Sequence, residues 1–292
     1  MERQAEERKK LVRISVRNLV EFVLRSGDID SRRSGQAQKD AMLEGSRIHR
    51  KIQKRMGSNY RAEVPLKHLV EDEEVTLLVE GRADGIEEEN GAVTIDEIKG
   101  VYMDLERLEE PVPVHLAQAM CYGYFYCCDK GLDGVRLQLT YCNLETEEIR
   151  RFVQAKSAEE LGVWFAGIVH EYMKWARFLY HHELTRDASI RGLEFPYPYR
   201  EGQRDLVVSV YKTISRKKRL FIQAPTGIGK TLSTVFPAVK AIGEGKGEKL
   251  FYLTAKTITR TVAEEAFRIL RGSGLIFSSV TITAKEKLCP LE

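Results

Sequence analysis

Two carboxylates and a lysine lie close together in residues 81–99, GRADGIEEENGAVTIDEIK. Asn90-Gly91 in the middle is the strongest short-range signal for a hairpin turn, because both residues tolerate a positive φ. A turn centred there places Asp84 directly opposite Glu97, with the two side chains about 5 Å apart on one face of the sheet. Lys99 follows Glu97 by two residues, so it projects to the same face.

This predicted pair of carboxylates poses an electrostatic problem. At an effective dielectric of about 20, two carboxylates about 5 Å apart repel each other by roughly 3 kcal/mol. A hard divalent cation such as Mg²⁺ or Mn²⁺ converts that repulsion into a binding site, since it prefers carboxylate and water oxygens. A neighbouring lysine could then stabilise charge on a phosphate or orient an attacking water. The alternative is a solvated acidic strand face, because Glu87 to Glu89 read as surface residues.

Two predicted helices carry further polar side chains. Gln118 and Tyr122 lie four residues apart in the apolar stretch 112–128, so they share one helix face. His49 lies in a helical stretch, 36–56, that Gly57 ends, and its imidazole could join a metal site. Alone, each of these residues is more often structural than functional.

Taken in order, His49, Asp84, Glu97-Ile-Lys99 and Gln118-x-x-x-Tyr122 resemble the PD-(D/E)XK nucleases, in the RecB-like branch that includes the CRISPR-associated exonucleases. The resemblance covers residues 10–185. It implies a restriction-endonuclease-like mixed sheet flanked by helices, and a DNA nuclease that uses Mg²⁺ or Mn²⁺. By position, His49, Asp84 and Glu97 would be metal ligands and Lys99 the catalytic lysine. Gln118 and Tyr122 would support the site or contact DNA.

A second motif follows further along the chain. Residues 220–223 are expected to form a short buried strand, and an apolar helix is expected from Leu232. The loop between them is typical of phosphate-binding loops, because its glycines let backbone N–H groups and a helix N-terminus face a phosphate. Its residues are Ala224, Pro225, Thr226, Gly227, Ile228, Gly229, Lys230 and Thr231. Lys230 would contact the β- and γ-phosphates of ATP, and Thr231 would hold Mg²⁺.

The loop begins with Ala224 where the general motif has glycine, a variant usual among superfamily 2 helicases. Residues 195–292 resemble the start of a DinG/XPD-type helicase of that superfamily. The resemblance implies a partial P-loop (RecA-like) α/β domain with strands at 220–223, 249–254 and 280–285. It also implies that Gln203 reads adenine and that Cys289 is the first ligand of an iron–sulfur cluster, which could form only in a full-length protein.

Composition agrees with a nucleic-acid enzyme without requiring one. The 292 residues are 43% hydrophobic and 30% charged with a net charge of +3, which permits DNA binding. The charged N-terminus has no apolar segment behind it, and no apolar run would span a bilayer, so we expect a cytoplasmic protein without membrane contact. Five cysteines without regular spacing argue against a disulfide framework.

We therefore expect an α/β chain with a nuclease domain at 10–185 and an incomplete helicase ATP-binding lobe at 195–292, separated by a polar boundary near 185–194. Its partner would be DNA, single-stranded or with a free end, in repair or processing. Because no Walker B acidic pair and no second lobe follow the phosphate loop, we expect no helicase or ATPase activity from this chain alone. The alternative is a catalytically silent fragment of a helicase that binds DNA or nucleotide.

Overall fold

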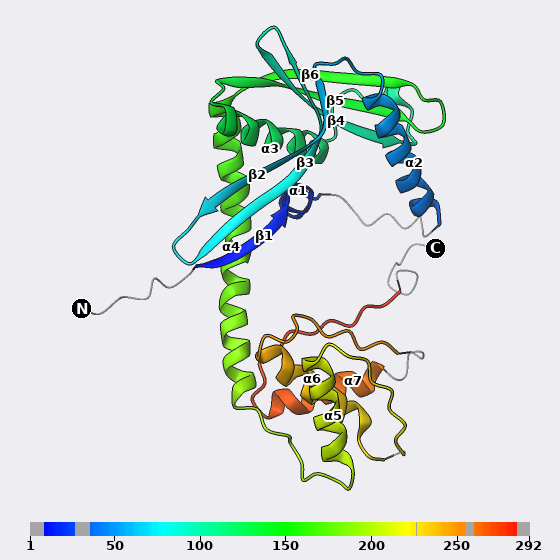
Figure 1. Cartoon of the computed structure of the whole chain (residues 1–292), viewed down its shortest axis with the longest axis vertical. Coiled ribbons are helices and arrows are strands. Elements are labelled where there is room, and N and C mark those ends of the chain that lie inside the picture. The colour runs from blue at the N-terminus through cyan, green and yellow to red at the C-terminus, as the bar shows by residue number, and fades with distance from the viewer. Residues whose placement is uncertain (1–8, 27–35, 226, 255–259, 285–292) are drawn as a thin grey trace, which may run out of the picture. The chain divides into compact units, whose positions relative to one another are not determined.

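The computed structural model describes residues 9–26, 36–225, 227–254 and 260–284. The chain divides into two compact units, which we treat separately. The N-terminal unit ends at Phe178, and the C-terminal unit runs from Leu179 to Pro290. Figure 1 shows the sheet and helices of the first and the helical cluster of the second.

The N-terminal unit is built on a mixed sheet of six strands. They are β1 (Lys10–Ser15), β2 (Tyr60–Glu71), β3 (Val75–Glu89), β4 (Ala92–Val101), β5 (Gly134–Asn143) and β6 (Ile149–Ser157). The order is β1-β3-β4-β5-β6, and β2 pairs with β3 from outside this path. β1 runs parallel to β3 and β4 runs parallel to β5, whereas the other pairs are antiparallel. β1 was not predicted.

The long strand β3 has two neighbours along one edge. β1 pairs with Val75 to Glu80, and β4 pairs with Gly85 to Glu89. Residues 81–84 therefore lie in a gap between these two strands, which exposes their backbone on that edge to groups other than a strand. Asp84 stands at the end of the gap nearest β4.

The predicted hairpin is confirmed, and its register is the expected one. Asn90 and Gly91 form the turn with φ of 50° and 79°, and Ala92 pairs with Glu89. The ladder ends at Gly85 and Asp96, one pair before Asp84 and Glu97. The two carboxylates were predicted to be a directly opposed pair; instead, β3 and β4 separate at this point.

Helices cover both faces of the sheet (Figure 1). They are α1 (Val16–Leu24), α2 (Gln36–Gln53), α3 (Pro113–Lys130), α4 (Ala158–Arg191) and the short 3₁₀ helix η1 (Leu105–Arg107). On the α2 face, Ile48 and Ile52 pack with Ile98 and Cys142. Side chains alternate along β4, so Glu97 and Lys99 point to the opposite face, where Gln118 of α3 bonds Lys99.

Two serines that precede apolar helical stretches in the sequence, a pattern that predicts helix caps, do cap helices in the structure. The Ser15 hydroxyl caps α1 by accepting from Asn18 N–H at 3.1 Å. Ser157 caps α4 by accepting from Glu160 N–H, and the Glu160 carboxylate accepts from Ser157 N–H, which makes a capping box. α4 extends to Arg191.

The C-terminal unit contains α5 (Gln203–Ser215), α6 (Lys230–Gly243) and α7 (Arg260–Gly272). Val207, Phe236, Val239 and Leu270 form the centre of its core. The strands predicted at 220–223, 249–254 and 280–284 are absent from the described residues of this unit. Parallel strands are stable only when both faces are covered, and here Phe221, Leu253 and Ile282 are 94%, 88% and 85% exposed.

No helix in the described ranges is long and apolar enough to cross a membrane. The four cysteines of the N-terminal unit are free thiols.

Candidate functional site

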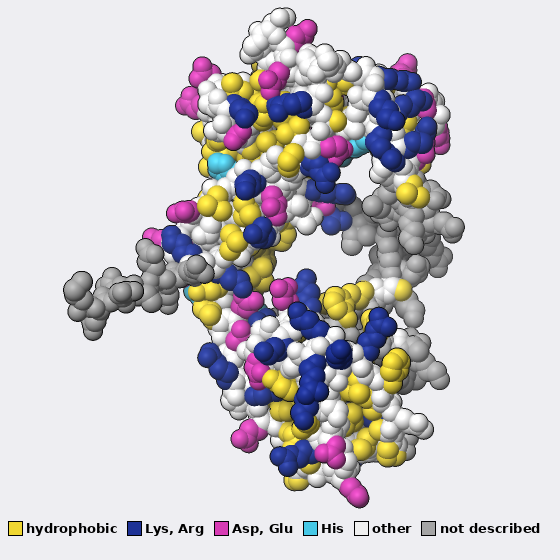
Figure 2. Space-filling model, viewed as in Figure 1, with side chains coloured by type: hydrophobic (Ala, Val, Ile, Leu, Met, Phe, Trp, Pro, Cys, Tyr) yellow, Lys and Arg dark blue, Asp and Glu magenta, His cyan; other side chains and the backbone are white. Residues whose placement is uncertain are grey.

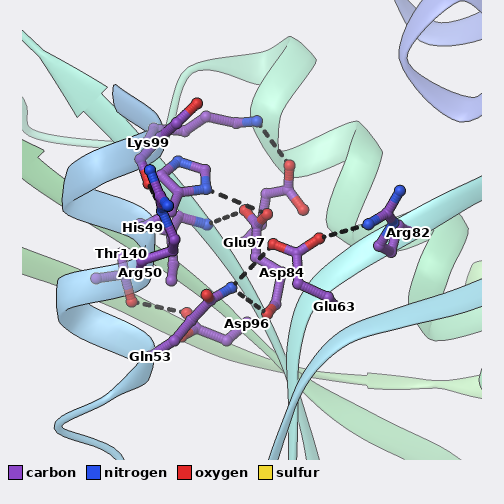
Figure 3. A network of polar contacts seen from close by, with 12 residues as sticks. His49, Arg50, Gln53, Glu63, Arg82, Asp84, Asp96, Glu97, Lys99 and Thr140 are labelled. Carbon is purple, nitrogen blue, oxygen red and sulfur yellow. Dashed lines mark hydrogen bonds and ion pairs between the residues drawn. The ribbon is translucent and has the colours of Figure 1, made fainter. Parts of the chain in front are cut away.

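Four of the predicted site residues converge where β3 and β4 separate (Figure 3). His49 comes from α2, Asp84 from β3, and Glu97 and Lys99 from β4. The His49 Nδ1 lies 3.3 Å from Asp84 Oδ1. Burial lowers the pKa of His49, but the contact with Asp84 outweighs it and raises the pKa above its ordinary value.

The Asp84 carboxylate fills the position of the missing ladder pair. Its Oδ2 accepts a hydrogen bond from the Ile98 backbone N–H at 2.7 Å. This bond satisfies the N–H that a paired strand would have taken, so the carboxylate is held in the gap of the sheet rather than in solvent.

Glu97 and Lys99 form a partly buried ion pair that reaches α3. Lys99 Nζ donates to Glu97 Oε1 at 2.6 Å and to Gln118 Oε1 at 3.0 Å. Burial raises the pKa of Glu97 to about 7, against the opposing effect of the Lys99 ammonium. Asp84 also raises the pKa of Glu97, so the two carboxylates repel each other although they are not a ladder pair.

Tyr122 of α3 packs over Gly81 of β3, and its hydroxyl bonds neither Lys99 nor Glu97. Its hydroxyl lies so close to Gly81 that a Cβ there would be 2.7 Å from it. Burial raises the pKa of Tyr122 far above its usual value, and Glu97 adds to this effect. The hydroxyl is therefore neutral at physiological pH.

A second polar network lies beside the site on the α2 face of the sheet. Asp96 is buried and accepts from the Thr140 hydroxyl at 2.7 Å and the Tyr60 hydroxyl at 3.1 Å. Burial raises the pKa of Asp96, and these hydrogen bonds oppose the rise. Tyr60 crosses β3 at Gly85, where any Cβ would overlap its ring at 1.8 Å. Only glycine fits at that position.

The donor types at the site suit a hard divalent cation. Glu97 Oε2 is buried without a hydrogen-bond partner, and such an orphaned carboxylate oxygen is costly unless a cation or donor meets it. His49 and Asp84 supply the imidazole nitrogen and the carboxylate that would complete a ligand set. Within the described ranges, however, no three His, Cys, Asp or Glu side chains are gathered closely enough to hold a metal ion as they stand.

The phosphate-loop residues of the C-terminal unit lie at the start of α6. Gly227 and Gly229 adopt the left-handed conformation, with φ of 87° and 77°, and Gly229 caps the helix. Lys230 Nζ donates to the carbonyl groups of Ala224 and Pro225 at 2.9 and 2.7 Å. The Thr231 hydroxyl is 3.3 Å from the Tyr252 hydroxyl. The lysine thus bonds its own loop beside the N-terminus of α6, and its contact with a phosphate stays a prediction.

Gln203 supports the same loop from α5. Its Nε2 donates to the Ile228 carbonyl at 2.8 Å, and its Oε1 accepts from Arg200 N–H at 3.0 Å. Arg200 also donates to the Gly227 carbonyl. Both ends of the Gln203 amide are engaged in this structure, and its role in reading adenine stays a prediction. Thr226 and Cys289 lie outside the described residues.

Comparison with known proteins bears on the C-terminal unit. Residues 203–288 match the DEAD/DEAH box helicase family. A stretch of 47 residues is 45% identical to the probable ATP-dependent helicase MJ0942 of Methanocaldococcus jannaschii, which is 16% of this chain and 7% of that protein. These matches show that residues 203–288 are similar to the ATP-binding domain of superfamily 2 helicases, and the matched segment spans only a small part of the length of that relative.

A solved structure resembles the chain more distantly. The crystal structure of SSO0001 covers 48% of this chain at 18% identity, with a TM-score of 0.35 and 65% of its own chain covered. At this TM-score the likeness decides neither fold nor function. The assignment of residues 10–185 to a nuclease therefore rests on the site itself, and the domain limits 10–185 and 195–292 stay predictions.

Two residues at the site, Gln53 and Glu63, were not predicted from the sequence. Gln53 Nε2 donates to the Asp84 carbonyl at 2.9 Å and to Glu63 Oε1 at 3.2 Å. The spacing of Gln53 to His49, one helical turn, could have indicated that both face the same way. Nothing in the sequence signals Glu63, because its contact depends on how β2 and α2 meet.

Proposed function

We propose that the N-terminal unit is a metal-dependent DNA nuclease of the RecB-like PD-(D/E)XK type. The observation that supports it best is the buried, unpartnered Glu97 Oε2 beside Asp84, His49 and Lys99. His49, Asp84 and Glu97 would hold the ion. A bound Mg²⁺ or Mn²⁺ would polarise a phosphodiester and lower the pKa of a water.

The protein side chains would supply the remaining chemistry. Lys99 would leave Glu97 for the substrate and stabilise the charge that develops on the phosphate. Gln118 would hold the ammonium in place, since it is buried and already accepts from Lys99. Tyr122 would hold α3 against β3 through the contact of its hydroxyl with Gly81.

We further propose that the C-terminal unit is the ATP-binding part of a DinG/XPD-type helicase, so that the two units act in DNA repair or processing. The phosphate loop and its match to the helicase family support this proposal. In such a helicase, Cys289 would be the first ligand of an iron–sulfur cluster.

Cleavage of end-labelled DNA tests the nuclease. The purified chain is incubated with single-stranded or duplex DNA in Mn²⁺, Mg²⁺ or EDTA, beside Glu97→Gln and Lys99→Ala. We expect metal-dependent cleavage that falls by about 10²–10³-fold in each variant, which is typical when one charge-stabilising group is removed. Circular dichroism checks that both variants remain folded. Equal cleavage by wild type and variants would show that the activity comes from a contaminant or another site.

One observation favours the second candidate, a catalytically silent DNA-binding module. Lys99 and Glu97 form an ion pair with each other, and among the described residues no three His, Cys, Asp or Glu side chains lie close enough together to hold a metal ion. DNA binding by a folded protein, without cleavage in any metal, would support this reading over the nuclease.

A further inference from the structure

The backbone opposite Asp84 has an unusual conformation. β2 and β3 pair from Tyr60–Glu87 to Glu71–Thr76, but the pairing passes from Ala62–Gly85 directly to Val64–Ala83. The skipped residues are Glu63 and Asp84, and Glu63 has a φ of 56°. A non-glycine residue in the left-handed region inside a strand is costly, and such strain gathers at functional sites.

Asp84 therefore pairs in neither of the two ladders beside it. On one side the β3–β4 ladder stops at Gly85, and on the other the β2–β3 ladder skips Asp84. The Asp84 carbonyl accepts instead from Gln53 Nε2 of α2. The backbone of a candidate metal ligand is therefore held by a side chain from another element.

Gln53 is itself held by Glu63. Its Nε2 lies 3.2 Å from Glu63 Oε1, and Arg82 donates to Glu63 Oε2, also at 3.2 Å (Figure 3). The left-handed turn at Glu63 thus has two effects: it frees the Asp84 carbonyl, and it brings a carboxylate to the amide that takes this carbonyl.

α2 contacts Asp84 at two points through this arrangement. His49 reaches the carboxylate, and Gln53, one turn later on the same helix face, reaches the carbonyl. Two contacts from one rigid helix to one residue fix how far the imidazole lies from the carboxylate.

We propose that Gln53 and Glu63 are positioning residues that set the geometry of His49 and Asp84 for a divalent cation. The proposal rests on the proposed function, because it needs these two side chains to bind a metal. Groups that orient metal ligands from outside the ligand set typically contribute 10–100-fold to metal affinity or activity.

A general anchoring of α2 is the competing explanation, and the chain offers a control for it. Glu147, at the β5–β6 turn, pairs with Lys51 and Arg47 of α2. It holds the same helix without touching Asp84. Glu147→Ala therefore loosens α2 while leaving the Gln53–Asp84 contact intact.

The variants Gln53→Ala, Glu63→Gly and Glu147→Ala separate these explanations. Mn²⁺ binding is measured by the electron paramagnetic resonance signal of free Mn²⁺, cleavage is measured against Mn²⁺ concentration, and thermal melting reports folding. We expect Gln53→Ala and Glu63→Gly to raise the Mn²⁺ Kd by about 10–100-fold. Glu147→Ala should leave the Kd within about 3-fold of wild type, since no contact to a proposed ligand is lost.

Glu63→Gly distinguishes positioning from stability. Glycine adopts a φ of 56° without strain, so this variant should melt no lower than wild type although it loses the carboxylate. Mn²⁺ affinity that is unchanged in Gln53→Ala and Glu63→Gly, or that falls equally in Glu147→Ala, overturns the positioning role alone. A wild-type chain that neither binds Mn²⁺ nor cleaves DNA overturns the proposed nuclease and this role with it.

Discussion

The surroundings of two histidines in the N-terminal unit shift their pKa values in opposite directions. His49 and His115 are both partly buried imidazoles, yet the pKa of His49 is raised and the pKa of His115 is lowered to about 4. Asp84 makes the difference for His49. His115 is affected mainly by burial and then by the positive charge of Lys99, and its Nδ1 lies 3.1 Å from the Tyr141 hydroxyl.

His115 therefore makes stability depend on pH. Its pKa is near 6.5 in an unfolded chain and about 4 when folded, so between these values only the unfolded state binds the proton. The contribution of neutral His115 to the free energy of unfolding is fully present above pH 6.5 and is lost as pH falls toward 4. Because each pH unit corresponds to at most ~1.4 kcal/mol, we expect His115 to contribute a loss of about 1–2 kcal/mol between pH 7 and pH 5.

Urea denaturation at pH 7 and pH 5 measures this loss. His115→Asn keeps a polar atom near the position of Nδ1 but cannot titrate, so its unfolding free energy should fall less between the two pH values. A wild-type protein and a variant with the same pH dependence would exclude His115 as the source.

For single residues, the sequence indicated which side chains form the site better than it indicated which side chains hold them in place. The types and spacing of His49, Asp84, Glu97 and Lys99 indicated the residues that the structure brings together. Glu63 could not be found, because a left-handed residue inside a strand follows from the tertiary fit of β2 and not from local preference.

Among elements, those with strong local signals were predicted best. Asn90-Gly91 set the β3–β4 register, and Ser15 and Ser157 set two helix starts. Elements with weak local signals, such as β1, were not predicted. β1 is a short strand at the end of a charged segment, and it is defined by its parallel pairing with β3, which local sequence does not encode.

α2 and the turn that follows it combine a site-facing side with a basic outer side. His49 and Gln53 face Asp84, whereas Arg50, Lys54 and Arg55 are exposed and make no ion pair with any described residue. Figure 2 shows Lys and Arg side chains gathered over this helix. If the proposed nuclease function holds, these cations would contact the phosphates of the DNA strand that enters the site.

Replacing these three cations by glutamine should weaken DNA binding in a salt-dependent way. Each phosphate contact to single-stranded DNA contributes about 0.7 to the slope of log K against log salt, so the slope should decrease by up to about 2. Fluorescence anisotropy with labelled single-stranded DNA measures it, in a Glu97→Gln background that prevents cleavage. Mn²⁺ affinity should not change, because the substituted residues do not contact the proposed ligands.

A matched triple variant controls for net charge. Lys67, Arg136 and Arg151 are exposed on strands of the same unit, and their replacement by glutamine removes the same charge from other places. If this control lowers the slope as much as the α2 variant does, the effect is one of overall charge, and α2 is not the contact surface.

For the whole molecule, prediction was good for helices and poor for the sheet of the C-terminal unit. α6 begins at Lys230, close to the helix expected from Leu232. The extended segments at 220–223, 249–254 and 280–284 are β-rich but form no ladder, and their apolar side chains are exposed. A parallel sheet depends on neighbours that are distant in sequence, so short apolar runs indicate only that a strand is possible.

The two proposed chemistries lie in separate units, which makes their independence testable. Lys230 lies in the phosphate loop and bonds only loop carbonyl groups, and Glu97 lies in the N-terminal unit. A lysine–phosphate interaction contributes about 1.5–3 kcal/mol, so Lys230→Ala should weaken ATP binding by about 10–100-fold. DNA cleavage by the same variant should be unchanged.

Equilibrium binding of a fluorescent ATP analogue, with DNA cleavage measured on the same preparations, tests both expectations. Lys246→Ala removes an exposed lysine elsewhere in the C-terminal unit and should alter neither readout. Glu97→Gln should show the reverse pattern, with normal nucleotide binding and no cleavage. Loss of cleavage in Lys230→Ala, with Lys246→Ala normal, would contradict independence and show that the nuclease site responds to the state of the phosphate loop.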